Sequence, residues 1–376
     1  MSDQEFARVA RDFARDHIDP NASAWERDRR MPRETIAEAA RAGLCDLLVA
    51  RELGGKGLGV SGMAGVMEAL AAGDMGFAFS LVCHNNLAGS ISGRGSDKHK
   101  EDYLGPMARA DLLGAFLLTE PGAGSDAASI ETLAVRDGDG WVLNGEKAWV
   151  TNAAEADLLN VYAQTEPGSG ARGIAAFLVR ADQPGVERSA PYHMFGAHAT
   201  GTGGFAFRDV HVTADQLFLA PGQAFRAAMS AIDIARIVVA AMCTGMLRRG
   251  LAVAVDYAAQ RTAFGGPLSE KQGLQWMLAD VATQTEAAAA LAARAAAAID
   301  ASDPQAGALA AHAKKFATRA AMDGLSECMQ AMGANGFRQD WPLARHLASA
   351  KMAQYLDGAT EIQNVVIARS LFGRIG

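Results

Sequence analysis

Segments typical of helices and segments typical of strands are segregated along this 376-residue chain instead of alternating. Residues 1–112 and 223–376 carry apolar positions at helical spacing, whereas residues 113–222 carry short β-type runs between turn sequences. A doubly wound parallel sheet needs alternating strands and helices, so this order excludes it. We therefore predict a mostly helical α+β fold with three domains: an N-terminal helical domain, a middle antiparallel β-barrel or sandwich, and a C-terminal four-helix bundle.

Local patterns support each of these domains. Residues 6–17 place apolar side chains at helical spacing. Asp-Gly and Asn-Gly pairs within residues 137–145 predict tight hairpin turns. The alanine-rich run 286–299 predicts a long helix, which must end before Pro304.

Composition limits the classes of function. The formal net charge is -7 and basic residues form no cluster, so we expect no nucleic-acid partner. Residues 1–20 are charged and lack the apolar segment of a secretory signal, and the apolar runs look shorter than a membrane span. We therefore expect a cytoplasmic protein that does not cross a membrane. The four cysteines form no CxxC pair and the eight histidines no metal-binding spacing, which predicts reduced thiols and no metal site.

A glycine-rich loop follows the apolar run 112–117, which is typical of a buried strand. Residues 118–126 read LTEPGAGSD. Glycine lets the backbone approach a ligand closely, and Thr, Ser and free backbone N–H groups supply hydrogen bonds. A generic loop of this kind is more often an ordinary turn, but the length and residue order of this one are unusual.

Five further motifs follow a consistent order along the chain. They read ELGG at 52–55, NGEKAWVTN at 144–152, RTAFG at 261–265 with Gln272, QAMGANGF at 330–337, and YLDGATEIQ at 355–363. With the loop at 118–126 they resemble the motifs of the acyl-CoA dehydrogenase family, written TEPxxGSD, NGxKxWITN, RxxFGxxL, QxxGGxGY/F and YEGTxxIQ. The resemblance covers nearly the whole chain.

The resemblance implies an oxidoreductase that desaturates an acyl-CoA thioester with FAD as cofactor. In the family a carboxylate removes the α-proton while flavin N5 takes the β-hydrogen as hydride. Hydrogen bonds to the thioester carbonyl make the α-carbon more acidic. An electron-transfer flavoprotein usually reoxidises the flavin, and members are typically homotetramers, so we expect both for this chain.

The resemblance also assigns roles to residues around the flavin. Thr119 and Thr151 would hydrogen-bond the isoalloxazine ring, and Trp149 would lie against its reactive edge. Ser125 would serve the pyrophosphate. The other positions expected at the cofactor from these motifs are Leu118, Gly124, Ala334, Thr360 and Glu361.

A neighbouring subunit would bind the adenosine half of FAD. A planar, permanently charged guanidinium suits a pyrophosphate, and the protein would have to oligomerise to hold its cofactor. The residues implied are Arg261, Phe264, Gln272 and Gln330. Those implied for the acyl-CoA substrate are Ser125, Asp233, Arg236 and Gly358.

The chain departs from the family at the position of the catalytic base. The family usually has Glu before the Gly of YEGT, and here Asp357 stands there. Asp is one methylene shorter, roughly 1.5 Å of reach, and a displacement of about 1 Å can cost on the order of 100-fold in rate. Some members carry the base just before the CoA-binding Arg instead, but here that residue is Ala235. We predict Asp357 as the base, with Glu361 a distant second.

Asp occurs at this position in family members that dehydrogenate cyclic esters such as cyclohexanecarboxyl-CoA, so the resemblance suggests a cyclic acyl group. Three alternatives stay open. The acyl group could be attached to an acyl carrier protein, or the same fold could catalyse a non-oxidising reaction. The third, a DNA-binding flavoprotein, is disfavoured by the acidic composition. Smaller departures are Ala334, residues 198–200, Ala359 and Asn364.

Overall fold

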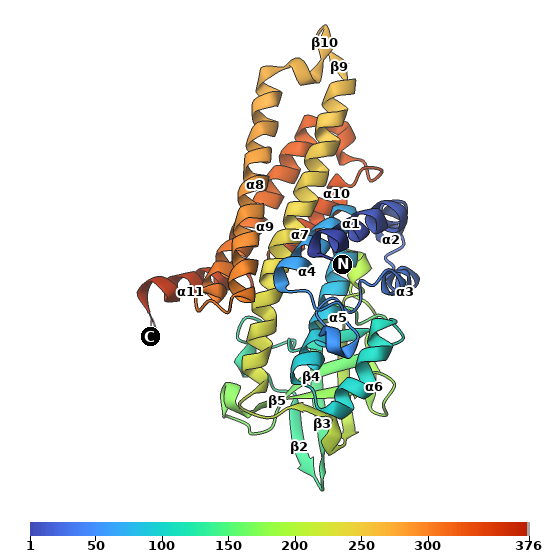
Figure 1. The fold of residues 1–376 in the computed structure, drawn as a ribbon, viewed down its shortest axis with the longest axis vertical. Helices are drawn as coiled ribbons and strands as arrows, with labels where there is room; N and C mark the ends of the chain where they lie inside the picture. The colour runs from blue at the N-terminus through green and yellow to red at the C-terminus, as the bar shows by residue number, and fades with distance from the viewer. Residues whose placement is uncertain (374–376) are drawn as a thin grey trace.

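The computed structural model describes residues 1–373 and arranges them in three regions along the chain (Figure 1). The first region consists of helices around an apolar core that includes Phe6, Trp25 and Phe77. Asp74 begins one of these helices, because its carboxylate accepts a hydrogen bond of 2.9 Å from the backbone N–H of Phe77. The helices are α1 (Asp3–Phe13), α2 (Ala22–Arg27), α3 (Arg33–Arg41), α4 (Val60–Gly73), α5 (Met75–Arg94) and α6 (Asp97–Ala108).

The middle region is an eight-stranded sheet with the strand order β6-β7-β3-β2-β4-β5-β8, and β1 pairs with β4. Most neighbours are antiparallel, but β1 and β2 each run parallel to β4, so the sheet is mixed rather than wholly antiparallel. The strands are β1 (Gly114–Leu117), β2 (Leu133–Asp137), β3 (Gly140–Val150), β4 (Leu158–Gln164), β5 (Ile174–Arg180), β6 (Val186–Arg188), β7 (Gly203–Val212) and β8 (Leu217–Leu219).

One of the two predicted hairpin turns is wrong. Strands β2 and β3 do pair across a tight turn between Asp137 and Gly140. Gly145 instead lies inside β3, where the register with β7 shifts. Its φ is +145°, and a Cβ on it would lie 2.6 Å from the Cα of Thr132. Glycine is needed there for a bulge and a close backbone approach, not for a chain reversal.

Strand β4 is buried on both of its faces. Leu159 and Val161 pack into the core on one face of the sheet. Leu158 and Tyr162 face the helices α5 and α6 on the other. Because alternate residues of a strand point to opposite faces, Asn160 shares the helix-facing side with Tyr162.

The third region is a bundle built around one long helix, α7 (Ala224–Gln260), which is 37 residues long. By length and composition α7 could cross a membrane, which corrects the expectation that no apolar run is long enough. A buried core helix has the same composition, and 61% of that apolar window is buried. The other helices are α8 (Gln272–Asp300), α9 (Ala306–Ala331), α10 (Leu343–Ala353) and α11 (Thr360–Phe372). The predicted helix–sheet–helix fold class is confirmed.

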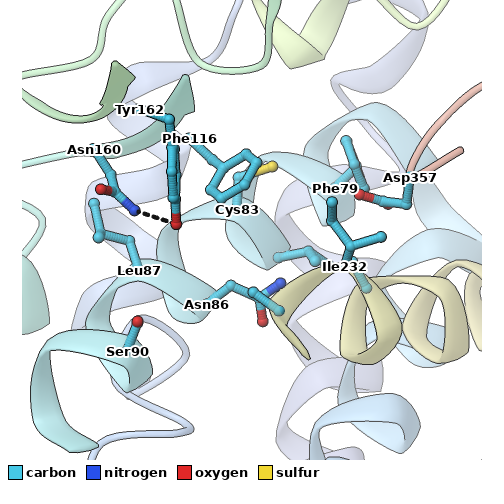
Figure 2. Close-up of a pocket in the computed structure, with 13 residues that line it drawn as sticks. Phe79, Cys83, Asn86, Leu87, Ser90, Phe116, Asn160, Tyr162, Ile232 and Asp357 are labelled. Atoms are coloured by element: carbon cyan, nitrogen blue, oxygen red, sulfur yellow. Dashed lines mark hydrogen bonds between the residues drawn. The ribbon is translucent and has the colours of Figure 1, made fainter. Parts of the chain in front are cut away.

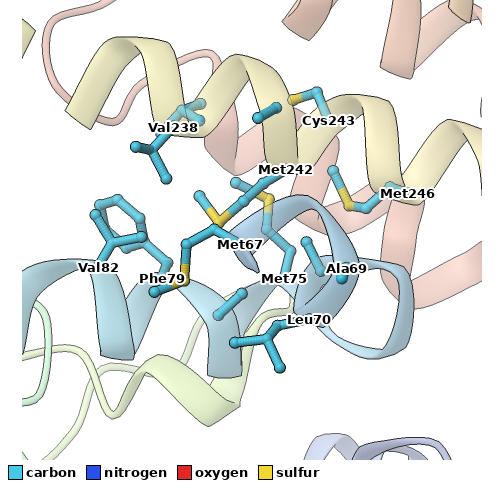
Figure 3. Close-up of a cluster of buried hydrophobic side chains, with 14 of the residues drawn as sticks. Met67, Ala69, Leu70, Met75, Phe79, Val82, Val238, Met242, Cys243 and Met246 are labelled. Carbon is cyan, nitrogen blue, oxygen red and sulfur yellow. The ribbon is translucent and has the colours of Figure 1, made fainter. Parts of the chain in front are cut away.

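Helices α4, α5 and α7 join the first and third regions through one apolar cluster. Figure 3 shows Met67, Met75, Met242 and Met246 at the centre of this contact. At Gly245 of α7, a Cβ would overlap the backbone carbonyl of Glu68 on α4. The helices can therefore approach closely only because this position lacks a side chain.

Two parts of the bundle extend away from the rest of the chain. A small hairpin of β9 (Thr262–Ala263) and β10 (Gly266–Pro267) lies at the far end of α7, opposite the sheet (Figure 1). Helix α11 projects sideways from the bundle (Figure 1). Both carry apolar side chains exposed in the single chain, including Phe264, Leu371 and Phe372.

Candidate active site

Two segments from separate sequence motifs lie side by side at the end of strand β1. Lys147 of β3 donates a hydrogen bond of 3.0 Å to the carbonyl of Leu118 and forms an ion pair of 2.7 Å with Glu120. The backbone N–H of Ala148 donates to the carbonyl of Thr119 at 3.0 Å. The loop 118–126 is thereby fixed against β3, and its outer residues, Gly124 and Ser125, remain exposed.

The ion pair between Lys147 and Glu120 is buried and has a structural role. Burial lowers the pKa of Lys147 to about 8, against the opposing charge of Glu120. Burial also acts to raise the pKa of Glu120, but Lys147 and the backbone N–H groups of Glu131 and Thr132 outweigh it and leave that pKa lowered. Removing one partner would leave an uncompensated buried charge, so both are needed to hold the loop.

Trp149 and Thr151 lie next to this loop but differ in exposure. Trp149 is 64% exposed, has a left-handed backbone with φ +58°, and contacts Tyr192 edge to face with ring centroids 4.9 Å apart. Thr151 is buried beside Cys83 of α5. Burial and the nearby Asp357 carboxylate raise the pKa of Cys83, so its thiol stays protonated. All four cysteines are free.

Three side chains hold the backbone that carries Asp357. Arg236 donates to the carbonyl of Asp357 at 2.9 Å, and Lys314 and Gln363 each donate to the carbonyl of Gly358 at 2.7 Å. Asp357 has φ +51° and Gly358 φ +92°, so both residues adopt the left-handed conformation. A non-glycine residue in this conformation is strained, and the three donors keep it there.

The carboxylate of Asp357 has no hydrogen-bond partner for Oδ2, which is buried. Burial raises the pKa of Asp357 to about 6, although the charges of Lys314 and Arg236 act to lower it. Burial likewise lowers the pKa of Lys314 to about 8, against the attraction of Asp357. A desolvated carboxylate without a hydrogen-bonding partner on Oδ2 is well suited to accept a proton.

Asp357 lies at one end of a pocket between α5, α7 and the helix-facing side of the sheet (Figure 2). Phe79 lies beside Asp357 in Figure 2, and Cys83 and Phe116 lie between these two residues and the opposite end. Asn160 and Tyr162 lie at the opposite end in Figure 2. The other lining residues are Val82, Asn86, Leu87, Ser90, Ala231, Ile232 and Ala235. The pocket thus leads from the predicted base into the interior.

The residues assigned to the adenosine half of the cofactor form a second group. Arg261, Phe264 and Gln272 are exposed at the β9–β10 end of the bundle, far from the loop 118–126 of the same chain (Figure 1). Gln330 and Ala334 belong to the same end, because the neighbouring Asn335 donates a hydrogen bond of 2.8 Å to Tyr257 near the end of α7. The chain therefore does not bring its two groups of predicted cofactor residues together.

The remaining predicted residues lie at or near Asp357. The guanidinium of Arg236 is buried and pairs with Asp233 at 2.8 Å. Thr360 and Glu361 form the first turn of α11, directly after the loop that carries Asp357 and Gly358. Glu361 is exposed and does not line the pocket, so its position does not favour it as the base.

Models of the three acyl-CoA dehydrogenase domains match the chain in order: the N-terminal domain at residues 2–111, the middle domain at 115–210 and the C-terminal domain at 222–372. The chain belongs to the acyl-CoA dehydrogenase family. It is 35% identical to the mitochondrial short-chain specific acyl-CoA dehydrogenase of Bos taurus, over 98% of this chain and 89% of that protein. This membership makes the protein an oxidoreductase.

Solved structures agree over nearly the whole chain. Butyryl-CoA dehydrogenase from Megasphaera elsdenii superposes with a TM-score of 0.95, at 34% identity over 98% of this chain and 97% of that one. The prolyl acyl carrier protein oxidase AnaB superposes with a TM-score of 0.93, at 25% identity over 98% of both chains. The fold is thus shared by an enzyme named for a CoA substrate and an enzyme named for an acyl carrier protein substrate.

Acyl-CoA dehydrogenases are FAD-dependent, and the residues present here fit FAD. Trp149 offers a bare aromatic face, and Phe264, which is 96% exposed, offers another. A Cβ on Gly124 would meet no atom within 4 Å, so the loop backbone is open to a phosphate. Thr119 and Ser125 supply hydroxyl groups beside it.

Sequence motifs missed several residues that the fold brings to the site. Lys314 lies 43 positions before Asp357 in an alanine-rich helix, and only its burial marks it as unusual. Lysine is almost never fully buried without a partner, but this burial is visible only in the structure and not in the sequence. The sequence does not reveal the roles of three further pocket residues, Asn86, Asn160 and Tyr162. One polar residue in an apolar run does not show whether its side chain points into a pocket.

Proposed function

We propose that this protein dehydrogenates an acyl-CoA thioester between Cα and Cβ, with Asp357 as the base. The observation that carries the proposal is the buried Oδ2 of Asp357, which has no hydrogen-bond partner, on a residue that lines the pocket. Its raised pKa of about 6 makes it a stronger base than an exposed aspartate, while leaving it mostly ionised at neutral pH. FAD supplies the hydride acceptor when it is bound.

The residues of this chain perform three tasks in the proposed reaction. The Oδ2 of Asp357 takes the α-proton. Arg236, Lys314 and Gln363 fix the backbone around Asp357, so that its side chain points at the substrate. Phe79 lines the pocket beside the base and, once substrate fills the pocket, helps to exclude water from it, which preserves its proton affinity.

We propose a compact acyl group, such as the ring of cyclohexanecarboxyl-CoA, next to the base. The shorter side chain of Asp357 sets the base back, and a ring brings its α-carbon forward more readily than a straight chain does. Ala235 supports this idea, because it lines the pocket together with Asp357 and its small side chain leaves space there. An acyl group linked to a carrier protein is the second candidate, favoured by the similarity to AnaB.

We also propose that the enzyme works as a homotetramer and passes electrons to an electron-transfer flavoprotein. Oligomerisation is supported by the separation of the two groups of cofactor residues within one chain (Figure 1). It is further supported by Phe264, Leu371 and Phe372, large apolar side chains that a single chain leaves in water. The cytoplasmic location, the lack of a membrane or nucleic-acid partner and the domain boundaries at 112 and 222 stay predictions.

The test is the flavin spectrum of the purified protein without oxygen. Butyryl-CoA, octanoyl-CoA, isobutyryl-CoA and cyclohexanecarboxyl-CoA are added separately, and bleaching of the flavin reports desaturation. We expect bleaching with cyclohexanecarboxyl-CoA and with few or none of the straight esters. Faster bleaching by a straight-chain ester would contradict the proposed ring-shaped acyl group. If the flavin is bleached only when the same acyl groups are presented on an acyl carrier protein, the substrate is a carrier-protein thioester and not an acyl-CoA.

A further inference from the structure

The end of the pocket that lies away from Asp357 is polar. Asn160 and Tyr162 project from β4 towards α5, and Asn86 and Ser90 of α5 line the same pocket (Figure 2). Asn160 and Tyr162 are each only 2% exposed. Polar side chains this deeply buried normally have all their hydrogen bonds satisfied, so this group requires an explanation.

The hydrogen bonds of this polar group are incomplete. Asn160 donates to the hydroxyl of Tyr162 at 3.3 Å, but its own Oδ1 is buried without a partner. If the amide were turned over, its nitrogen would be left in the same position, so one polar atom of Asn160 lacks a partner in either orientation. The Oδ1 of Asn86 is also buried without a partner.

These unpaired polar atoms disfavour the binding of an apolar ligand. Water can satisfy them while the pocket is empty of substrate. An apolar acyl chain that displaces this water leaves two amide oxygens unpaired, whereas a hydroxyl or N–H group replaces the lost hydrogen bonds. The free O–H of Tyr162 can donate to the same substituent, because its oxygen already accepts from Asn160.

Charge and size narrow the choice of ligand. Among the lining residues that the structure describes, none is Lys or Arg. Arg94 of α5 acts on Tyr162 through its charge, but it is exposed and does not line the pocket, so a carboxylate at this end would have no counter-ion in the pocket itself. The cavity volume is about 40 Å³, which holds roughly three or four waters at 10–15 Å³ each. A long chain would not fit without movement of the walls.

We propose that the substrate is a short acyl thioester whose far end carries an uncharged hydrogen-bond donor, such as a hydroxyl group, bound by Asn160, Asn86 and Tyr162. The proposal rests on the proposed dehydrogenation for the position of the thioester at Asp357. It adds a specificity site at the opposite end of the pocket. Asn160 is its central residue, because it is as buried as Tyr162, donates to the Tyr162 hydroxyl and carries an oxygen without a partner.

The experiment compares matched esters that differ by one hydroxyl. The pairs are cyclohexanecarboxyl-CoA with 4-hydroxycyclohexanecarboxyl-CoA, and butyryl-CoA with 4-hydroxybutyryl-CoA. For each pair kcat/KM and the Kd from calorimetry are measured on the FAD-loaded enzyme. We expect the hydroxylated member of at least one pair to be favoured about tenfold or more in both quantities, the value of one good hydrogen bond.

Variants assign the preference to residues. Asn160→Leu keeps the side-chain size and should reduce the preference to less than about threefold, mainly by improving the apolar ester. Tyr162→Phe removes only one hydroxyl and should give an intermediate preference. It also keeps the test valid if Asn160→Leu fails to fold. Tyr103→Phe on α6, outside the pocket, is the matched control and should keep the full preference.

The outcomes separate the two proposals. Equal or better turnover and binding of the unsubstituted esters would overturn the specificity site and leave the dehydrogenase intact. Tight binding of a hydroxylated ester without any flavin bleaching would support the site and reject the dehydrogenation. If the hydroxyl preference survives in Asn160→Leu, the assignment to Asn160 is wrong. If none of the four esters binds, both proposals fail.

Discussion

At the scale of single residues, the site depends on how Asp357 is made both basic and rigid. Its backbone is held in a left-handed conformation by donors from α7, α9 and α11, while its Oδ2 receives no hydrogen bond. Lys314 contributes twice, through its hydrogen bond to Gly358 and through its charge. These two contributions can be separated by experiment.

Replacing Asp357 by Asn should abolish turnover and keep the cofactor. Asn has nearly the same shape but cannot accept the α-proton, and general bases contribute roughly 100- to 10,000-fold to rates. We expect a loss of at least about 100-fold in kcat, with an unchanged flavin content by absorbance. Asp256→Asn, at an exposed position of α7, is the matched control. Near-normal activity of Asp357→Asn would mean that another group is the base.

The acid side of the pH profile should report the titration of Asp357. The base must be ionised, so kcat/KM should fall about tenfold per pH unit below the pKa of about 6 and level off above it. Lys314→Met removes a positive charge that lowers this pKa, so the acid limb should move to higher pH. Lys315→Met, which changes the exposed neighbour, should leave the limb in place. An unmoved limb in Lys314→Met would show that the charge of Lys314 does not set this pKa and that its hydrogen bond to Gly358 is its main contribution.

At the scale of elements, the contact between α4 and α7 fixes the pocket relative to the bundle. Gly245→Ala should destabilise the fold, because its Cβ would overlap the carbonyl of Glu68 and force the helices apart. We expect a loss of about 1–3 kcal/mol in the free energy of unfolding, measured by urea denaturation. Gly93→Ala on α5 meets no atom within 4 Å and should be neutral or stabilising by up to about 1 kcal/mol. Equal stability of both variants would contradict this packing argument.

Elements also show what the sequence could and could not predict. The segregated helix and strand patterns predicted the fold class, because periodicity is a local property of the chain. Residues 144–145 were misread, since Asn-Gly suits a bulge inside β3 as well as a hairpin turn. Asp357 was found through its motif. Lys314 and Asn160 were not, because their importance comes from packing between α9, α5 and β4, which no local pattern encodes.

At the scale of the whole molecule, the two groups of residues that we expect at FAD lie far apart in one chain. The loop around Ser125 and Trp149, which we expect at the flavin ring, lie at the sheet, while Arg261 and Phe264 lie at the other end of α7 (Figure 1). Arg236 of α7 contacts the Asp357 loop and Arg261 follows 25 positions later, so at 1.5 Å per residue the two lie roughly 37 Å apart along the helix. No single FAD can reach across that length within one chain. Two chains arranged head to tail can bring the two groups together.

This arrangement predicts complementation between two inactive variants. Arg261→Glu should lose FAD, because the variant places a negative charge at the cofactor phosphates, and Asp357→Asn should lose turnover. Co-expression allows mixed oligomers. In these, one site takes Asp357 from the Arg261→Glu chain and Arg261 from the Asp357→Asn chain, so both residues are intact. Random assembly should restore about a quarter of the wild-type activity per site if each site takes its parts from two chains. Mixing the separately purified proteins without subunit exchange is the control and should restore none. If co-expression also restores none while the mixed oligomer forms, Arg261 serves the site of its own chain or no site at all.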